Sequence, residues 1–172
     1  MKRLLTLILV MGFGLSTTTL FAGDYYMGAK KCGMCHKKKH EVHNKAMTAH
    51  PHMTTAFGKL NAEEQKNPEC VVCHTTGFAK GGYEIKDEAF WTPAEDDSKG
   101  KKAVKRMKNL QMVGCESCHT DMTDKDNYMK HKKKDSGYVA YKPDENNCKT
   151  CHNPKSPTFK KINFAEEIKK LK

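Results

Sequence analysis

The chain lacks three things: a second long apolar run, a clear strand pattern and an unpaired cysteine. Beyond the N-terminal residues, no segment is apolar enough to span a membrane. Strand signals are scarce and no βαβ pattern is recognisable, which argues against a thioredoxin-like site at any Cys-x-x-Cys motif. Only 37% of the 172 residues are hydrophobic, too few for the core of an ordinary domain of this length.

The N-terminus has the pattern of a secretory signal peptide. Lys2 and Arg3 supply its positive start, residues 4–20 are apolar or small, and polarity rises after Ala22. We therefore expect cleavage after Ala22, export to the periplasm, and a mature chain of residues 23–172 that forms one domain without stable membrane insertion. The alternative is a single membrane anchor, which the short run, with its glycines and hydroxyl residues, disfavours.

The eight cysteines form four Cys-x-x-Cys pairs, and a histidine follows each pair directly. The cysteines are Cys32, Cys35, Cys70, Cys73, Cys115, Cys118, Cys148 and Cys151, and the histidines are His36, His74, His119 and His152. A zinc site has no need of that histidine, and a disulfide scaffold does not explain four copies of one pentapeptide. Haem c explains every position, because two thiols bind its vinyl groups and the adjacent imidazole reaches the iron. The sequence therefore predicts four covalently attached haems.

The chain is basic, which affects the choice of partner. Its formal net charge is +11, and Lys2 and Arg3 account for two of these charges, so the mature chain carries +9. Such a charge often indicates nucleic acid binding. Haem propionates reduce it, because four oxidised haems remove roughly four positive charges and four reduced haems roughly eight. We therefore expect redox proteins, and no nucleic acid, as partners.

Turn residues and apolar spacing predict a mainly α fold of short helices and long irregular loops wrapped around the four haems. Helices are expected over residues 30–50, 54–66 and 101–112, and at the C-terminus, with Asn163 as N-cap and Phe164, Ile168 and Leu171 on one face. Residues 75–100 are glycine-rich and are expected to form a loop with a hairpin around residues 83–85. The haems supply much of the missing core, so the chain without haem should be largely unfolded.

Five histidines outside the motifs are candidates for the sixth iron positions. They are His40, His43, His50, His52 and His131. Imidazole is the commonest ligand at this position, and a solvated histidine is the alternative for each residue. Methionine is the competing ligand, and Met47 and Met53 lie nearest the histidine cluster. On a helix, His36, His40 and His43 share one face, which places the last two beside the first haem.

The segments around the motifs follow a recognisable pattern. They read YMGAKKCGMCH, MTAH ending at His50, CVVCHTTGFAKGGYEI, VGCESCH and, as a looser match, CKTCHNPKSPTF. From about Tyr26 to the fourth motif, this pattern resembles the tetrahaem cytochrome c-554 family, whose founding member accepts electrons from hydroxylamine oxidoreductase. The resemblance implies that His50 ligates the iron of His119, and that His131 ligates the iron of His36. It also implies that the iron of His74 can be five-coordinate and open to small ligands, with a filled or buried position as the alternative.

The chain departs from that family at three places. Residues 120–122 replace a Gly-Pro-Gly after the third motif, residues 44–46 replace a tryptophan segment, and no histidine follows His152. The family's fourth haem takes its distal ligand from a C-terminal extension, so here that ligand must come from elsewhere or be absent. The leading candidates are His43 and His52, with His40 behind them.

Electron transfer between redox partners is the function that these features favour, without enzyme activity. Four haems in a mature chain of about 150 residues must lie close together, so an electron can cross the molecule in short hops. The alternatives are a small reductase of nitric oxide, nitrite or hydroxylamine at an open iron, and a subunit of a larger multihaem conduit. The basic stretch Lys101, Lys102, Lys105, Arg106 and Lys108 either docks an acidic partner or is a solvated helix face.

Overall fold

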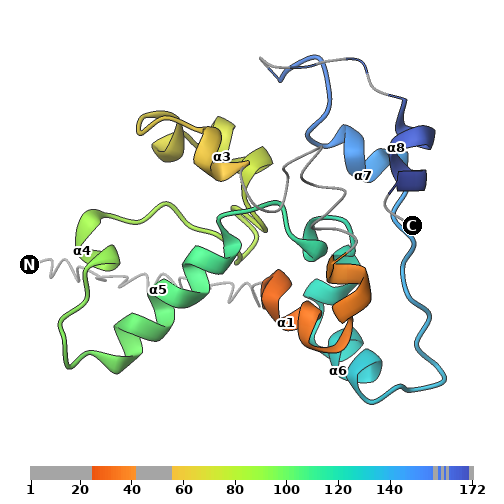
Figure 1. Cartoon of the computed structure of the whole chain (residues 1–172), viewed down its shortest axis with the longest axis horizontal. Coiled ribbons are helices and arrows are strands. Elements are labelled where there is room, and N and C mark those ends of the chain that lie inside the picture. Colours follow the sequence, from red (N-terminus) through yellow and green to blue (C-terminus); the bar gives the residue numbers. More distant parts are fainter. Residues whose placement is uncertain (1–24, 42–55, 157–158, 160, 162, 171–172) are drawn as a thin grey trace, which may run out of the picture.

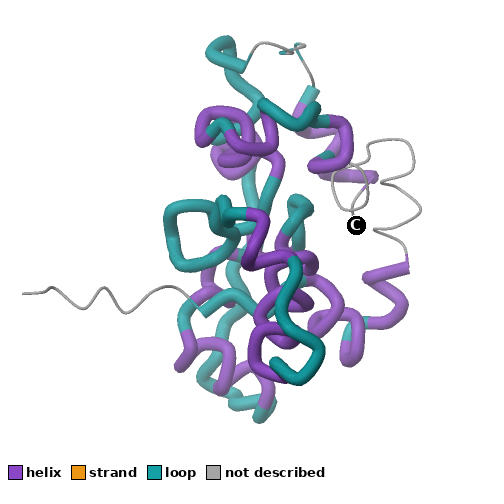
Figure 2. The backbone as a smooth tube through the Cα atoms, turned by 90° about the vertical axis from the view of Figure 1, so that its left-hand side faces the viewer, coloured by secondary structure: helices purple, strands orange, loops and turns teal. Residues whose placement is uncertain are grey.

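Short helices joined by irregular loops make up the part of the chain that the structure describes. The structure, a computed structural model, describes residues 25–41, 56–156, 159, 161 and 163–170. The elements are α1 (Ala29–Cys35), η1 (Phe57–Lys59), η2 (Glu64–Lys66), α3 (Pro68–His74), α4 (Glu88–Trp91), α5 (Ser98–Leu110), η3 (Cys115–Ser117), η4 (Thr120–Thr123), α6 (Lys125–Lys132), α7 (Glu145–Lys149) and α8 (Phe164–Lys170). These ranges contain no strand (Figure 2). The mainly α prediction is confirmed, and the hairpin predicted around residues 83–85 is wrong.

Short polar side chains determine where several helices begin. The side chains of Asn67, Asp87, Asp97, Asp124 and Asp144 each accept a backbone N–H of the helix that follows. The same chemistry explains why the single helix predicted over residues 54–66 is wrong. The Asn61 side chain accepts the N–H groups of Glu63 and Glu64, and Leu60 is extended, so two separate 3-10 turns form there.

The helix predicted over residues 30–50 is interrupted at the first motif. α1 ends at Cys35, and His36 leaves helical geometry with φ −108° and ψ 46°. A new helical turn then covers residues 37–41, and the rest of the predicted helix lies outside the described residues. The predicted C-terminal helix is present as α8, while the side chain of Ile168 and all of Leu171 lie outside the description.

α5 is the longest described helix and carries much of the apolar core. It begins three residues before the predicted start, because Asp97 caps it. Val104, Met107 and Leu110 recur every three residues along it and are buried. Met107 and Leu110 pack with Val71 of α3 and with the rings of Tyr26, Phe57 and Tyr83. Figure 1 shows α5 running from the centre of the molecule toward α4 at one end.

Four further helices, α1, α6, α7 and α8, lie toward the opposite end of the molecule from α4. In Figure 1, α1 and α6 lie below and to the right of centre, and α7 and α8 lie above them. Thr76, just after the second motif, bonds the chain that runs from the end of α5 to the third motif. Its N–H donates to Leu110 O (2.9 Å). Its Oγ1 donates to Met112 O (2.5 Å) and accepts from Gly114 N (2.8 Å). The exit from the second motif is thereby joined to the entry of the third. In the described part of the chain, no helix is long and apolar enough to cross a membrane.

Candidate functional site

Each Cys-x-x-Cys-His motif lies on a turn of helix. The histidine N–H donates to the carbonyl of the first cysteine in three motifs: His36 to Cys32 (2.9 Å), His119 to Cys115 (2.8 Å) and His152 to Cys148 (2.9 Å). The second motif lies within α3, which ends at His74. A helical turn places residues three and four apart on one face. The two thiols and the imidazole of each motif therefore lie on the same side of the turn, which fits a group bound at two sulfurs and one nitrogen.

The motifs are far apart in the sequence, but the structure brings their thiols together. The Cys32 and Cys115 side chains of the first and third motifs lie close enough to interact, and so do the Cys73 and Cys151 side chains of the second and fourth. Cys118 of the third motif interacts electrostatically with cysteines of the fourth. All four motifs thus belong to one connected cluster, with the first paired to the third and the second to the fourth.

The thiols differ in acidity because of these contacts. The hydrogen bond between Cys73 and Cys151 raises the pKa of Cys73, and the same bond lowers the pKa of Cys151 to about 6, helped by Thr150. The bond between Cys32 and Cys115 acts in the same way, raising the pKa of Cys32 and lowering that of Cys115. In each pair, one sulfur is therefore the better anion and the other the hydrogen-bond donor.

His131 of α6 meets His36 of the first motif. Their Nε2 atoms are 3.1 Å apart, the ring centroids are 5.3 Å apart and the rings are inclined by 24°. The centroid distance exceeds the nitrogen distance by 2.2 Å, roughly two ring radii, so the two nitrogens point at each other. Bonds from a metal to imidazole are about 2 Å long, so an iron held by both rings requires them to separate by only about 1 Å. The donor pair therefore fits axial ligation of a haem iron.

His74 of the second motif is held by its other ring nitrogen. Its Nδ1 lies 2.6 Å from the carbonyl oxygen of Ala56, which accepts the Nδ1–H. This bond fixes the tautomer and leaves Nε2 free of a proton, as an iron ligand requires. Sequence reasoning did not identify Ala56, because the bond joins a backbone carbonyl to a residue 18 positions away.

Glu116, a spacer residue of the third motif, is a buried carboxylate that sequence reasoning also missed. It is 2% exposed and accepts the backbone N–H groups of Met27 (2.5 Å) and Gly28 (2.9 Å). Burial raises the pKa of Glu116, while these two bonds and the Arg106 guanidinium act in the opposite direction. The third motif is thereby bound to the residues that lead into α1, which supports the contact between the first and third motifs.

The remaining predicted ligands are only partly described. His43, His50 and His52, with Met47 and Met53, lie outside the described residues, so their ligand roles stay predictions. His40 lies beside the first motif, because a Cβ added at Gly33 would be 2.9 Å from its ring. Glycine in this spacer therefore leaves room for the His40 imidazole.

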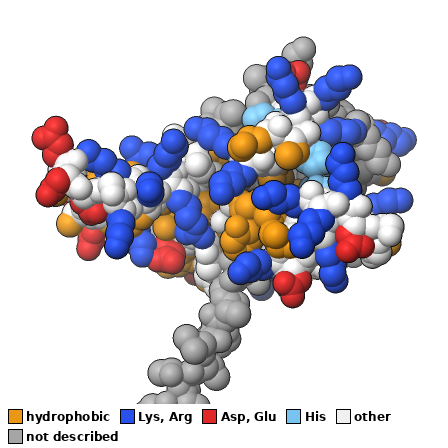
Figure 3. Space-filling model, turned by 90° about the horizontal axis from the view of Figure 1, so that it is seen from below, with side chains coloured by type: hydrophobic (Ala, Val, Ile, Leu, Met, Phe, Trp, Pro, Cys, Tyr) orange, Lys and Arg blue, Asp and Glu red, His pale blue; other side chains and the backbone are white. Residues whose placement is uncertain are grey.

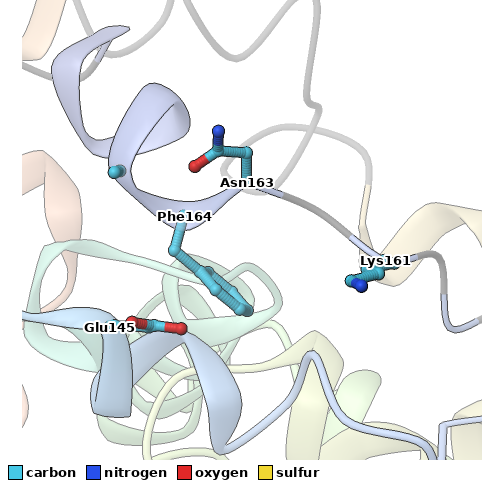
Figure 4. A pocket seen from close by; sticks show the side chains of 5 residues that line it. Glu145, Lys161, Asn163 and Phe164 are labelled. Carbon is cyan, nitrogen blue, oxygen red and sulfur yellow. The ribbon is translucent and has the colours of Figure 1, made fainter.

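A pocket between α7 and α8 contains none of these groups. Glu145, Lys161, Asn163, Phe164 and Ala165 line it, and the Phe164 ring points toward Glu145 (Figure 4). A second pocket lies against the apolar core, beside Phe57, Tyr83 and Trp91. No motif cysteine or histidine lines either pocket, so neither belongs to the cluster of motifs.

Pairs of thiols on a helical turn, each followed by an imidazole, define a c-type cytochrome. The model of one protein family, described as cytochrome c554 and c-prime, matches residues 31–120. These 90 residues are more than half of the chain's 172 and include the first three motifs. The chain belongs to this family of c-type cytochromes, which supports covalently bound haem and electron transfer. No curated protein and no solved structure matched the chain.

Proposed function

We propose that this chain is a periplasmic carrier that passes electrons between redox proteins through four covalent haems. The observation that carries the proposal is the convergence of the four motifs, seen in the contacts between Cys32 and Cys115 and between Cys73 and Cys151. Each bound haem supplies an iron that cycles between two oxidation states. The attachment points form one connected cluster, so electrons can cross the molecule without a moving part.

The chain's own residues have separate tasks in this proposal. The eight motif cysteines attach the haems, and His36, His74, His119 and His152 are the proximal ligands. His131 is the distal ligand opposite His36, which their facing nitrogens support. His50 is proposed opposite His119, and His43 or His52 opposite His152. Irregular loops between short helices wrap the haems, which supply much of the apolar core that the sequence lacks.

Basic side chains favour acidic partners. Figure 3 shows Lys and Arg spread over the lower face of the molecule, with histidine side chains among them on its right half. Lys37 and Lys38 follow His36, and Lys130 and Lys132 flank His131, and all four are exposed. A positive field around a redox centre attracts an acidic protein and orients it during encounter.

A titration combined with spectroscopy of the oxidised holoprotein tests this function. An electron carrier with four haems takes up four electrons per chain and returns them all to an oxidant. Low-spin iron at every haem, unaffected by cyanide or nitric oxide, is expected of a carrier whose sixth positions are filled. A high-spin signal near one quarter of the iron, with turnover of nitric oxide, nitrite or hydroxylamine, would instead support the reductase alternative.

A further inference from the structure

His131 lies in a part of the fold that its own helix does not hold firmly. α6 has only eight residues, none of them buried, and His131 lies in its last turn. Short helices fray at their ends and depend on tertiary contacts for stability. A histidine that must face His36 across an iron therefore needs support from outside α6.

Tyr138 supplies such a contact. The chain turns back after α6 through Lys134, at φ +55°, and Asp135, whose N–H donates to Lys130 O (3.0 Å). This turn places the Tyr138 ring against the His131 ring, with centroids 5.3 Å apart and planes inclined by 70°. Aromatic rings favour such edge-to-face contacts over direct face-to-face stacking.

Asp121 in turn anchors Tyr138. The Tyr138 hydroxyl donates to Asp121 Oδ2, which also accepts the N–H of Tyr141 (3.1 Å). Asp121 follows His119 by two residues. The contacts therefore run from the third motif, through Asp121 and Tyr138, to His131 and His36.

We propose that Tyr138 is a positioning residue for His131, holding its imidazole toward His36 by the ring edge and tied to the third motif through Asp121. The inference rests on the proposed function, because it assumes a haem iron between His36 and His131. Tyr138 touches neither the iron nor a substrate. Its effect is to keep the sixth position of the first haem filled.

Four variants of the holoprotein test this inference by electron paramagnetic resonance and by the midpoint potential of each haem. His131→Ala is the reference and should turn about one quarter of the iron high-spin, one haem in four. Tyr138→Leu removes ring and hydroxyl and should give a large part of the same signal, together with a shifted potential for one haem. Tyr138→Phe keeps the ring edge but loses the hydrogen bond to Asp121, so its iron should stay low-spin while cyanide binds several-fold faster than in Tyr141→Phe. Tyr141→Phe is the control, because its hydroxyl donates to Asn147 Oδ1 (2.7 Å), away from His131.

The outcomes separate the inference from the function beneath it. If His131→Ala leaves all iron low-spin, His131 is not an iron ligand, and the positioning role of Tyr138 is overturned as well. If His131→Ala opens one haem and Tyr138→Leu has the wild-type spectrum, potentials and cyanide binding, only the positioning role is overturned. Should Tyr138→Leu fail to mature, Tyr138→Phe decides: cyanide binding at least several-fold faster than in Tyr141→Phe supports the role, and equal rates overturn it.

Discussion

At the scale of single residues, Glu116 is an ionisable side chain in a buried environment. It stands between two haem-attaching cysteines, where the motif allows any residue, yet it is almost fully buried. Both carboxylate oxygens accept backbone N–H groups that lead into α1. A neutral amide at this position has only one acceptor oxygen, and its NH2 group would face an N–H donor.

Glu116→Gln should therefore lower the free energy of unfolding of the holoprotein by about 1–3 kcal/mol at pH 7, the cost of leaving a buried donor unpaired. Urea unfolding monitored by circular dichroism measures it. The matched control is Glu69→Gln, an exposed carboxylate directly before Cys70, which should change stability by less than about 0.5 kcal/mol. Equal effects of the two substitutions would show that the buried hydrogen bonds do not support the fold.

Glu116 also makes the free energy of unfolding of the wild type depend on pH. Burial raises the pKa of Glu116 above its ordinary 4.5, so the folded chain binds this proton more readily than the unfolded chain. The corresponding stability is fully present below pH 4.5 and is lost as the pH rises through the raised pKa. The free energy of unfolding of the wild type should therefore fall as the pH rises across that window.

Residues of the motifs could be predicted from the sequence, and their supporting residues could not. The spacing of cysteines and histidines follows directly from the chemistry of haem attachment, so it is visible in the sequence. The resemblance to the family suggested His131, which the structure places against His36. Glu116, Ala56 and Tyr138 gave no such signal. Glu116 bonds backbone groups 88 and 89 positions away, Ala56 bonds a histidine 18 positions away, and Tyr138 bonds an aspartate 17 positions away. Only folding brings these partners together.

At the scale of elements, helices with an apolar stripe were predictable and polar ones were not. α5 has Val104, Met107 and Leu110 at helical spacing, and it was predicted to within a few residues. α6 and α7 bury no side chain, so hydrophobic periodicity gave no indication of them. Their start signals, Asp124 and Asp144, are caps that look like ordinary loop residues in a polar chain.

The basic elements can be distinguished by charge reversal. Changing Lys37, Lys38, Lys132 and Lys133 to Glu alters the surface beside His36 and His131, and changing Lys101, Lys102, Lys105 and Lys108 to Glu alters α5 by the same net charge. We expect the first variant to be reduced about tenfold more slowly by reduced flavodoxin, an acidic carrier, at low ionic strength. The α5 variant should be affected less, because α5 extends toward α4 and away from α1 and α6 (Figure 1).

Salt dependence and midpoint potentials show whether the two variants differ in reduction rate because of docking. The difference between the two variants should shrink at high salt, where charges on the surface are screened. Midpoint potentials measured on both variants exclude a change in driving force. A larger slowing in the α5 variant would place the docking surface on that helix instead.

At the scale of the whole molecule, four motifs spread along the sequence form one cluster. The contacts of Cys32 with Cys115 and of Cys73 with Cys151 join segments that the sequence does not show to be neighbours. Composition did indicate that the apolar core would be small, and the described core is a modest group around Leu110 and Val71. It did not indicate which motifs pair, because pairing depends on long-range bonds such as those of Thr76 and Glu116.

The most direct test of this account is the intact mass of the exported holoprotein under denaturing conditions. A chain with four covalent haems has the mass of residues 23–172 plus four haems, because each thiol adds to a vinyl group without a leaving group. Replacing Cys70 and Cys73 by Ala should remove one haem and leave the other three attached. Fewer than four haems on the wild-type chain, or free thiols at any of the four motifs, would contradict it.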